Sequence, residues 1–421
     1  MSNPPKRARS HFLVGLVCLT FFVISFVTNI LGPLVPDIIR DFHVSQGMAG
    51  MLAFSFFIAY GVLSIPAGFL VERWGEKRLM IASFLACTAG ALAFAMWPTY
   101  PVAVASLFAI GSGMAALQVA INPLLRVAGG EEHYAFYSAL AQMTFGVASF
   151  ISPLVFSWLI AQLADPAGRG ALAAYLARLT PAALPWVSMY WLFALSTALM
   201  VVVIALSRLP KVERTADESA GTLGMYRELM RSRVVWAYFF SIIAYVGCEQ
   251  GTADWMSQFL FRYHGFNPDV EGARAVSWFW GLMTVGCLIG LVLLKLYDSR
   301  RVLLAFSVGA IAMLTLALYG EARVSLYAFP LIGLFASIMW PTVFSLGLNS
   351  IAEHHGPLAG ILCSGIMGGA LVPFVIGHLA DAFGLRAGML LLYVTFGAVL
   401  AVGLWARPLV SNALIASRSQ T

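Results

Sequence analysis

The stretch GFLVERWGEKRLMIASFLACTAGALAFAMW, residues 68–97, joins a short charged segment to an apolar run that begins at Leu79 and contains no charged residue. The side chains of 81–97 would be apolar on every face of a helix, whereas a strand of a membrane β-barrel alternates polar and apolar positions. A helical run of this length spans the roughly 30 Å hydrocarbon core of a bilayer. The stretch therefore predicts a transmembrane helix that follows a charged loop.

Comparable runs recur along the whole chain of 421 residues, of which 60% are hydrophobic and 10% are charged. Soluble domains carry about 25% charged residues, so this composition excludes an ordinary soluble protein. We expect an all-α polytopic membrane protein whose first span continues unbroken through Pro33. Cutting the chain at charge clusters and Pro/Gly-rich turns predicts twelve spans, near 12–35, 48–70, 79–97, 102–125, 135–163, 187–207, 234–261, 275–296, 302–319, 325–349, 358–381 and 387–406.

The longest polar interruption, 207–233, divides the spans into two groups of six. We expect an N-terminal bundle over 1–207, a cytoplasmic linker over 208–233 and a C-terminal bundle over 234–421. A weak internal repeat supports this division, because IGSGMAALQVAINP from Ile110 and IGLFASIMWPTVFS from Ile332 each lead into a glycine-rich span. Pseudo-symmetric halves with a site between them are typical of transporters.

The basic residues are distributed unevenly between the two sides of the predicted membrane. Of the 25 lysine and arginine residues, 18 fall on the side that carries both termini and 7 on the other side. The positive-inside rule therefore places both termini in the cytoplasm, and the formal net charge of +6 requires no nucleic-acid partner.

Charged residues cluster in two loops at corresponding places in the two halves. In both loops, acids and bases can form a charge network across the ends of neighbouring helices, while glycines allow close helix approach. A solvated positive-inside loop is the alternative interpretation. The residues concerned are Gly68, Glu72, Arg73, Gly75, Lys77 and Arg78 in the first loop, and Asp298 and Arg300 in LKLYDSRR.

The first loop closely resembles the signature GxLxDRxGRK of the major facilitator superfamily, with Glu72 at the acidic position. Further strings narrow the resemblance to the fucose/proton symporter family of sugar permeases, and more closely to its glucose/galactose branch. These strings are FFIAYGVLSIPAGFL (56–70), LQVAINP (117–123), YVGCE (245–249), WPTVFSLGL (340–348) and GGALVPFVIGHLAD (368–381). The resemblance implies the twelve-helix major facilitator fold, a hexose or related monosaccharide as substrate, and cation coupling by alternating access.

The sequence departs from the fucose branch at three positions of that pattern. Gly32 stands where the fucose branch carries an acidic residue, Gln118 stands where it carries Glu, and Cys287 replaces the Arg of a Gly-Arg pair. Proton coupling by the usual groups of the family is therefore not expected, which keeps an uncoupled uniporter open as an alternative.

Two acids in YVGCEQGTADW, Glu249 and Asp254, lie inside a predicted span. A buried carboxylate costs about 2.5–3.5 kcal/mol on insertion scales, so its retention indicates a cavity, an ion or a proton. The resemblance places a Glu at the position of Glu249, and we expect it to line the central cavity and couple to H⁺ or Na⁺. Gly247 and Gly251 would let the helix unwind there. Asp254 is a second candidate for cation coupling, with pairing near a helix end as the alternative.

A sugar is bound by amide groups that hydrogen-bond its hydroxyls and by an aromatic ring that packs on its C–H face. Interhelical hydrogen bonding is the alternative role for the amides, and interfacial anchoring is the alternative for tryptophan. The candidate substrate-binding residues are Asn29, Gln118, Asn122, Gln142, Gln250 and Asn349, together with Trp255, Trp280 and Trp340.

Other function classes find little support in the sequence. The five cysteines have no metal-ligand spacing, and no phosphate-binding GxxxxGK[ST] motif is present. We therefore expect no metal site and no bound cofactor, and we do not expect the protein to be an enzyme. A multidrug exporter on the same fold and a non-transporting membrane protein remain as rivals. We expect a monomer in a bacterial inner membrane, without an obligate protein partner.

Overall fold

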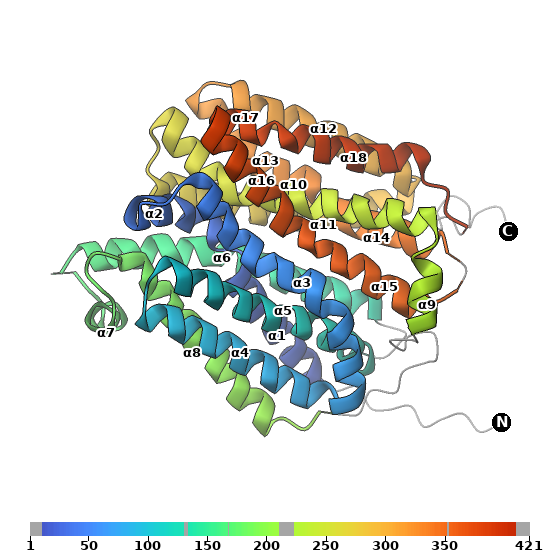
Figure 1. Ribbon diagram of the computed structural model, residues 1–421, viewed down its shortest axis with the longest axis horizontal. Coiled ribbons are helices and arrows are strands. Elements are labelled where there is room, and N and C mark those ends of the chain that lie inside the picture. The colour runs from blue at the N-terminus through green and yellow to red at the C-terminus, as the bar shows by residue number, and fades with distance from the viewer. Residues whose placement is uncertain (1–10, 130–133, 167, 210–222, 352, 410–421) are drawn as a thin grey trace.

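The computed structural model describes residues 11–129, 134–166, 168–209, 223–351 and 353–409, and it is a bundle of long helices (Figure 1). The helices of the first half are α1 (His11–Thr28), α2 (Leu31–Phe42), α3 (Gln46–Trp74), α4 (Glu76–Met96), α5 (Tyr100–Gly129), α6 (Tyr134–Ala164), α7 (Ala171–Leu179) and α8 (Ser188–Leu206). Those that follow are α9 (Leu223–Leu229), α10 (Arg233–His264), α11 (Ala273–Leu296), α12 (Ser299–Tyr319), α13 (Ala322–Ala336), α14 (Met339–Leu348), α15 (His355–Ser364), α16 (Gly368–Phe383), α17 (Leu385–Met389) and α18 (Leu391–Trp405).

All twelve predicted spans correspond to helical segments, which confirms the predicted fold class. Eleven segments of the described residues are long and apolar enough to cross a membrane. The remaining long helix is α10, whose 32 residues include the acids Glu249 and Asp254. The short helix α7 lies in a connection for which no helix was predicted, whereas α9 lies in the predicted linker, where the sequence shows a short helical pattern around 226–230.

The first span is not continuous, which corrects the sequence prediction. Helix α1 ends at Thr28 and α2 begins at Leu31, and the intervening residues form a turn. Pro33 has no backbone N–H to donate to the carbonyl four residues earlier, at Asn29, so the ladder is interrupted there. The tenth span breaks in the same way four residues before Pro341, and the Cys287 thiol donates to the carbonyl freed at Ser337, 3.3 Å away.

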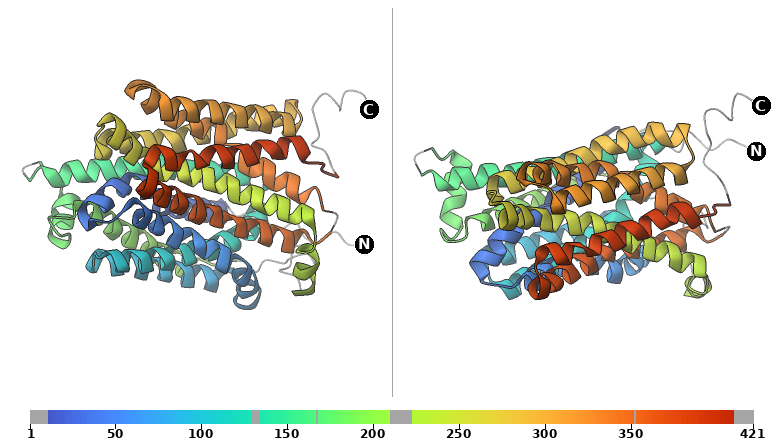
Figure 2. Two further views of the ribbon diagram at one scale, coloured as in Figure 1. Left: turned by 45° about the horizontal axis from the view of Figure 1, so that its top comes forward. Right: turned by 90° about the horizontal axis from the view of Figure 1, so that it is seen from above.

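The helices of the two halves form two groups that run roughly parallel along the long axis (Figure 1). Figure 2 shows that helix α9 lies at the end of the bundle where α1 begins and α18 ends, which we call the linker end. Residues 210–222 of the predicted linker lie outside the described residues. The loops that follow α2, α4 and α10 lie at the opposite end, which we call the far end (Figures 1 and 2).

At the far end the two halves pack together through α2 against α10 and α3 against α16. Glycines bring the backbones into contact. A Cβ on Gly32 would lie 2.2 Å from the Ala253 carbonyl oxygen, and one on Gly50 would lie 2.9 Å from that of Pro373. The far end is therefore closed by backbone-to-backbone packing of the kind that small residues permit between membrane helices.

Polar contacts reinforce this closure. The Asp381 carboxylate on α16 accepts hydrogen bonds from the backbone N–H groups of Gln46, at 2.9 Å, and Gly47, at 2.8 Å. An acid from one half thus caps the N-terminus of α3 in the other half, where the helix dipole favours negative charge. Also at the far end, Asp37 on α2 forms an ion pair with Arg40 at 2.6 Å, and Asp269 of the second half lies close to it.

We expect Gly32→Ala to destabilise this conformation by about 1–3 kcal/mol, because the added methyl group cannot fit against the Ala253 carbonyl. Thermal unfolding of the purified protein measures the effect. Gly15→Ala is the matched control, since a Cβ at Gly15 meets no atom within 4 Å. A melting temperature for Gly32→Ala equal to that of the control would show that the far end is not closed in this way.

We expect Asp381→Ala to lower the free energy of unfolding by about 1–2 kcal/mol. Among the described residues, Asp381 is the only side chain of the other half that caps the first turn of α3, and the variant removes that cap. The melting temperature of Asp381→Ala should be lower than that of the wild type. Asp381→Asn retains one carbonyl acceptor, so its melting temperature should lie between those of the wild type and Asp381→Ala. Equal stability of Asp381→Ala and the wild type would contradict the capping role.

Candidate functional site

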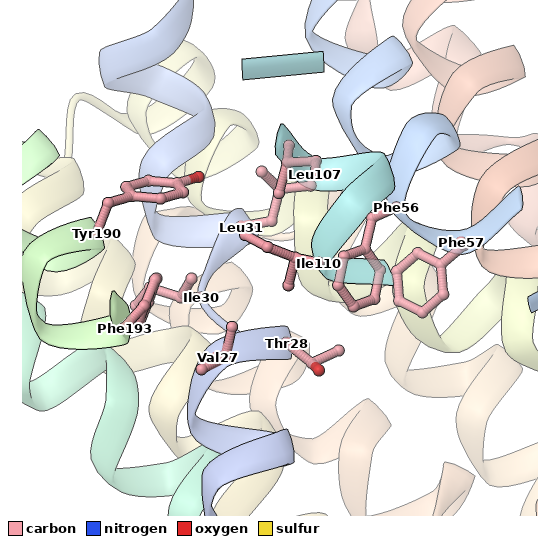
Figure 3. A pocket seen from close by; sticks show the side chains of 10 residues that line it. All are labelled: Val27, Thr28, Ile30, Leu31, Phe56, Phe57, Leu107, Ile110, Tyr190 and Phe193. Carbon is pink, nitrogen blue, oxygen red and sulfur yellow. The ribbon is translucent and has the colours of Figure 1, made fainter. Parts of the chain in front are cut away.

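Two of the cavities within the described residues differ in character. The smaller one, of about 10 Å³, lies beside the break between α1 and α2 and is lined by apolar side chains such as Val27, Phe56 and Phe193 (Figure 3). Its volume holds at most about one water molecule. It is a packing defect rather than a substrate site.

The larger cavity has a volume of about 320 Å³ and lies between the two halves. This is within the range of small-molecule sites. It extends from the middle of the bundle toward the linker end, where Glu72 near the end of α3 and Gly356 on α15 line it. It is lined by Phe21, Tyr60, Ser64, Ile65, Gly68, Val71, Glu72, Ala115, Gln118, Val119, Gln142, Tyr226, Trp340, Phe344, Gly356, Ala359, Gly360, Cys363 and Ile366.

Three predicted substrate-binding residues meet in this cavity: Gln118 from α5, Gln142 from α6 and Trp340 from α14. The Tyr60 hydroxyl hydrogen-bonds with Gln118, which positions the amide. Trp340 stacks on Phe344 with ring centroids 5.6 Å apart and packs near Tyr245. Amide donors and acceptors on one side and an aromatic wall on the other are the two features that sugar binding requires.

The backbone of Asn122 lies in α5, but its side chain lies outside the described part of the structure. Asn29 is buried and donates to the Ser149 hydroxyl at 2.8 Å, which ties the break after α1 to α6. Asn349 caps α14 toward the linker end, where its carbonyl accepts from the Leu409 N–H at 2.8 Å. In this conformation, neither Asn29 nor Asn349 lines the cavity.

Two predicted tryptophans are also outside the cavity lining. Trp255 is 1% exposed and its indole N–H donates to the Pro373 carbonyl at 3.1 Å, so it holds α10 against α16. Trp280 is buried in α11 with its ring edge-on to Phe279. Both rings are covered by neighbouring helices here, and neither presents a free face to the cavity.

The acid Glu249 is engaged by its own helix rather than by the cavity. Its carboxylate accepts from the Tyr245 hydroxyl and, at 3.0 Å, from the side-chain amide of Gln250. Asp254 is 4% exposed and its Oδ2 atom has no hydrogen-bond partner. The two acids thus occupy different surroundings on α10, as their five-residue separation predicts.

Helix α10 is continuous through Gly247 and Gly251, so the predicted unwinding is wrong for this conformation. A Cβ on Gly247 would lie 2.3 Å from Val372 Cγ2, and one on Gly251 would lie 3.0 Å from Ile376 Cδ1. The glycines allow α16 to pack closely on α10, and the closed ladder of backbone hydrogen bonds keeps the carbonyls occupied.

The first charged loop is an ordered link between helix ends. Gly75 has a φ of 79°, a conformation that favours glycine, at the junction of α3 and α4. The Lys77 ammonium donates to the carbonyls of Ala205 and Ser207, each at 2.8 Å, at the end of α8. Arg73 and Arg78 are exposed, whereas Gly68 and Glu72 line the cavity.

The second loop forms a similar link. Asp298 caps α12 by accepting from the Arg300 backbone N–H at 2.8 Å, and the Arg300 guanidinium donates to the Ala406 carbonyl at 3.2 Å. Partial burial acts to raise the pKa of Asp298, but the backbone N–H and guanidinium of Arg300 outweigh burial and hold the pKa below its usual value.

Among the cavity residues with polar or sulfur-bearing side chains, the sequence analysis did not predict Tyr60, Ser64, Tyr226 and Cys363. Tyr60 and Ser64 carry a detectable signal, because polar side chains four residues apart in an apolar run share one helix face. Tyr226 on α9 gives no such signal, since its packing on Phe69 and near Gly360 depends on tertiary structure. Burial and the nearby Glu72 charge raise the pKa of Tyr226.

Comparisons with known proteins identify relatives that match most of the chain. A glucose/galactose transporter of Brucella abortus is 29% identical to this chain over 406 residues, and the match covers 93% of each chain. The L-fucose-proton symporter of Escherichia coli is 26% identical over 400 residues, and the match covers 90% of this chain and 89% of the symporter. The crystal structure of the E. coli fucose:proton symporter superposes with a TM-score of 0.67 at 22% identity, covering 94% of this chain and 99% of that one.

The family model for the Major Facilitator Superfamily matches residues 17–362, which is most of the chain. The family and these relatives are transporters and not enzymes. This chain, a multi-pass membrane protein of twelve spans, belongs to the Major Facilitator Superfamily.

Proposed function

We propose that this transporter imports a monosaccharide, a hexose such as glucose or galactose, coupled to H⁺ or Na⁺. The observation that carries the proposal is the meeting of Gln118, Gln142 and Trp340 in one cavity between the halves. The names of the glucose/galactose and fucose relatives, which match nearly the full length of the chain, support the same substrate class.

The proposed orientation in the membrane rests on the charge distribution. The linker end carries 18 of the 25 basic residues in the predicted topology, so we assign it to the cytoplasm of a bacterial cell and the far end to the periplasm. The cavity extends toward the linker end while glycine contacts and the Asp381 cap close the far end. The structure then corresponds to the inward-facing half of an alternating-access cycle.

A multidrug exporter is the principal rival. Lipophilic cations are bound in wide aromatic cavities with few polar groups, whereas this cavity presents two glutamines, two tyrosines and a serine beside Trp340. Buried polar groups discriminate strongly against ligands that leave them unpaired. The composition of the wall therefore favours a ligand with several hydroxyl groups.

The first test is uptake of labelled glucose into proteoliposomes that contain the purified protein, under an imposed pH gradient and, separately, an imposed Na⁺ gradient. We expect accumulation above equilibrium under one gradient, with competition by galactose. Equilibration without accumulation would identify an uncoupled uniporter. Absence of uptake for glucose, galactose and fucose would contradict the proposal and favour the exporter.

We expect Glu249→Gln to abolish gradient-driven accumulation while sparing counterflow exchange. The amide keeps the size of the side chain that contacts Tyr245 and Gln250, but it carries neither a charge nor a titratable proton. Labelled-sugar counterflow and accumulation are measured in the same proteoliposomes. Glu321→Gln, an exposed acid at the start of α13, is the control that should transport normally. Undiminished accumulation by Glu249→Gln would remove this residue from the coupling mechanism.

A further inference from the structure

Beyond Glu249, one face of α10 carries three buried oxygen atoms without a hydrogen-bond partner: Asp254 Oδ2, Ser257 Oγ and Gln258 Oε1. Their residues are 4%, 0% and 6% exposed. Positions i, i+3 and i+4 of a helix lie on the same face, so the three side chains emerge side by side. Buried polar atoms in proteins are almost always paired, and three orphans on one turn require an explanation.

Ser257 differs from other hydroxyl residues on the same helix. Ser241 and Thr252 each donate to the carbonyl four residues earlier, at 2.7 Å, which is the usual way to satisfy a hydroxyl inside a membrane helix. The Ser257 hydroxyl makes no such bond. Its oxygen is therefore free to bind a ligand.

Glycines of neighbouring segments pack closely on this face. A Cβ on Gly272, in the short turn Pro268–Gly272 before α11, would lie 2.3 Å from Ser257 Oγ. A Cβ on Gly32 of α2 would lie 3.4 Å from the Asp254 Cα. Gly272 therefore packs directly on the Ser257 hydroxyl, and Gly32 packs on the backbone at Asp254. We call the buried surroundings of the three orphan oxygens the polar recess.

The recess contains a buried carboxylate, that of Asp254, which has no positively charged partner among the described residues. No ion pair formed by the described residues includes Asp254, and Arg40, the base of α2, is engaged by Asp37 and Asp41. An isolated buried carboxylate is strongly unfavourable unless it is neutralised. A proton on Asp254 would supply one donor, whereas a cation would bind all three acceptors together. Carboxylate, hydroxyl and amide oxygens are the ligands that hard cations prefer.

We propose that Asp254, Ser257 and Gln258 are ligands of a bound Na⁺ ion. This inference rests on the proposed function, because it names the ion that would drive sugar import. Glu249 lies more than a turn away and its two oxygens already accept from Tyr245 and Gln250, so it belongs to a separate site.

The position of the recess explains how the ion would act. Helix α2 belongs to the first half, whereas α10 and the turn before α11 belong to the second, and all three pack together at the closed far end. Separation of the halves at this end would expose the recess to the far side, and their closure would cover the ion. Binding of Na⁺ would then favour closure around it, which is a direct link between the ion and alternating access.

The test measures Na⁺ binding to the purified full-length protein without sugar. Its melting temperature is recorded as NaCl replaces choline chloride at constant ionic strength, with KCl as the comparison, and ²²Na⁺ binding is measured by equilibrium dialysis. We expect a saturable, Na⁺-specific rise for the wild type. Ser257→Ala and Asp254→Asn should weaken Na⁺ binding by about tenfold or more, as loss of a ligand requires.

Ser307→Ala is the matched control, because Ser307 on α12 is equally buried and its hydroxyl is also unpartnered, but it lies outside the recess. This variant should bind Na⁺ like the wild type. The proposal is overturned if the wild type shows no Na⁺-specific shift, if stability responds to pH but not to Na⁺, or if Ser257→Ala retains full affinity. Ser257→Ala keeps the charge and nearly the volume of the site, so it remains informative if Asp254→Asn does not fold.

Failure of this inference and failure of the proposed function give different results. Sugar uptake without Na⁺ binding would refute the Na⁺ site and leave hexose transport standing. Specific Na⁺ binding without uptake of any tested hexose would refute the substrate and leave the cation site standing.

Discussion

The structure depends on one constraint, that a backbone inside the hydrocarbon core must satisfy its own hydrogen bonds. Helices meet this requirement, and irregular backbone is tolerated only where protein covers it. Two of the interrupted spans, the first and the tenth, obey this rule. Each breaks four residues before a proline, at Pro33 and at Pro341, and in the second break the Cys287 thiol binds the freed Ser337 carbonyl. The second break therefore lies where a neighbouring helix supplies a partner for the freed carbonyl.

The same requirement explains how the two halves can close and open. Their contact at the far end consists of glycines such as Gly32 and Gly50 against carbonyls, with the Asp381 carboxylate capping α3. Backbone surfaces and a helix terminus form much of this interface, together with ring contacts such as that of Phe54 on α3 with Phe374 on α16. Such an interface separates without disrupting the core of either half. The cavity at the other end shows the complementary arrangement, in which the halves are lined by amides and rings instead of being packed together.

Polar groups inside the bundle divide into those that are satisfied and those that are not. The Asn29 amide donates to Ser149 and Glu249 accepts from Tyr245 and Gln250, so these atoms are paired within the protein, whereas Asn29 Oδ1 has no partner. Asp254 Oδ2, Ser257 Oγ and Gln258 Oε1 have no partner. Since unpaired polar atoms are costly in a membrane protein, these positions are where a transported or coupled ligand has most to contribute.

The sequence by itself determined the fold class, the twelve spans and the charged loops, because length, hydropathy and charge act locally along the chain. It also predicted Gln118, Gln142 and Trp340, whose polar or aromatic character stands out within apolar runs. Only the tertiary structure decided that these three meet in one cavity while Trp255 and Asn349 lie outside it, that α10 stays continuous, and that Tyr226 reaches the cavity. The physical reason is that the surroundings of a side chain in a helix bundle depend on which neighbouring helices cover its face. The spacing of residues within one span does not contain that information.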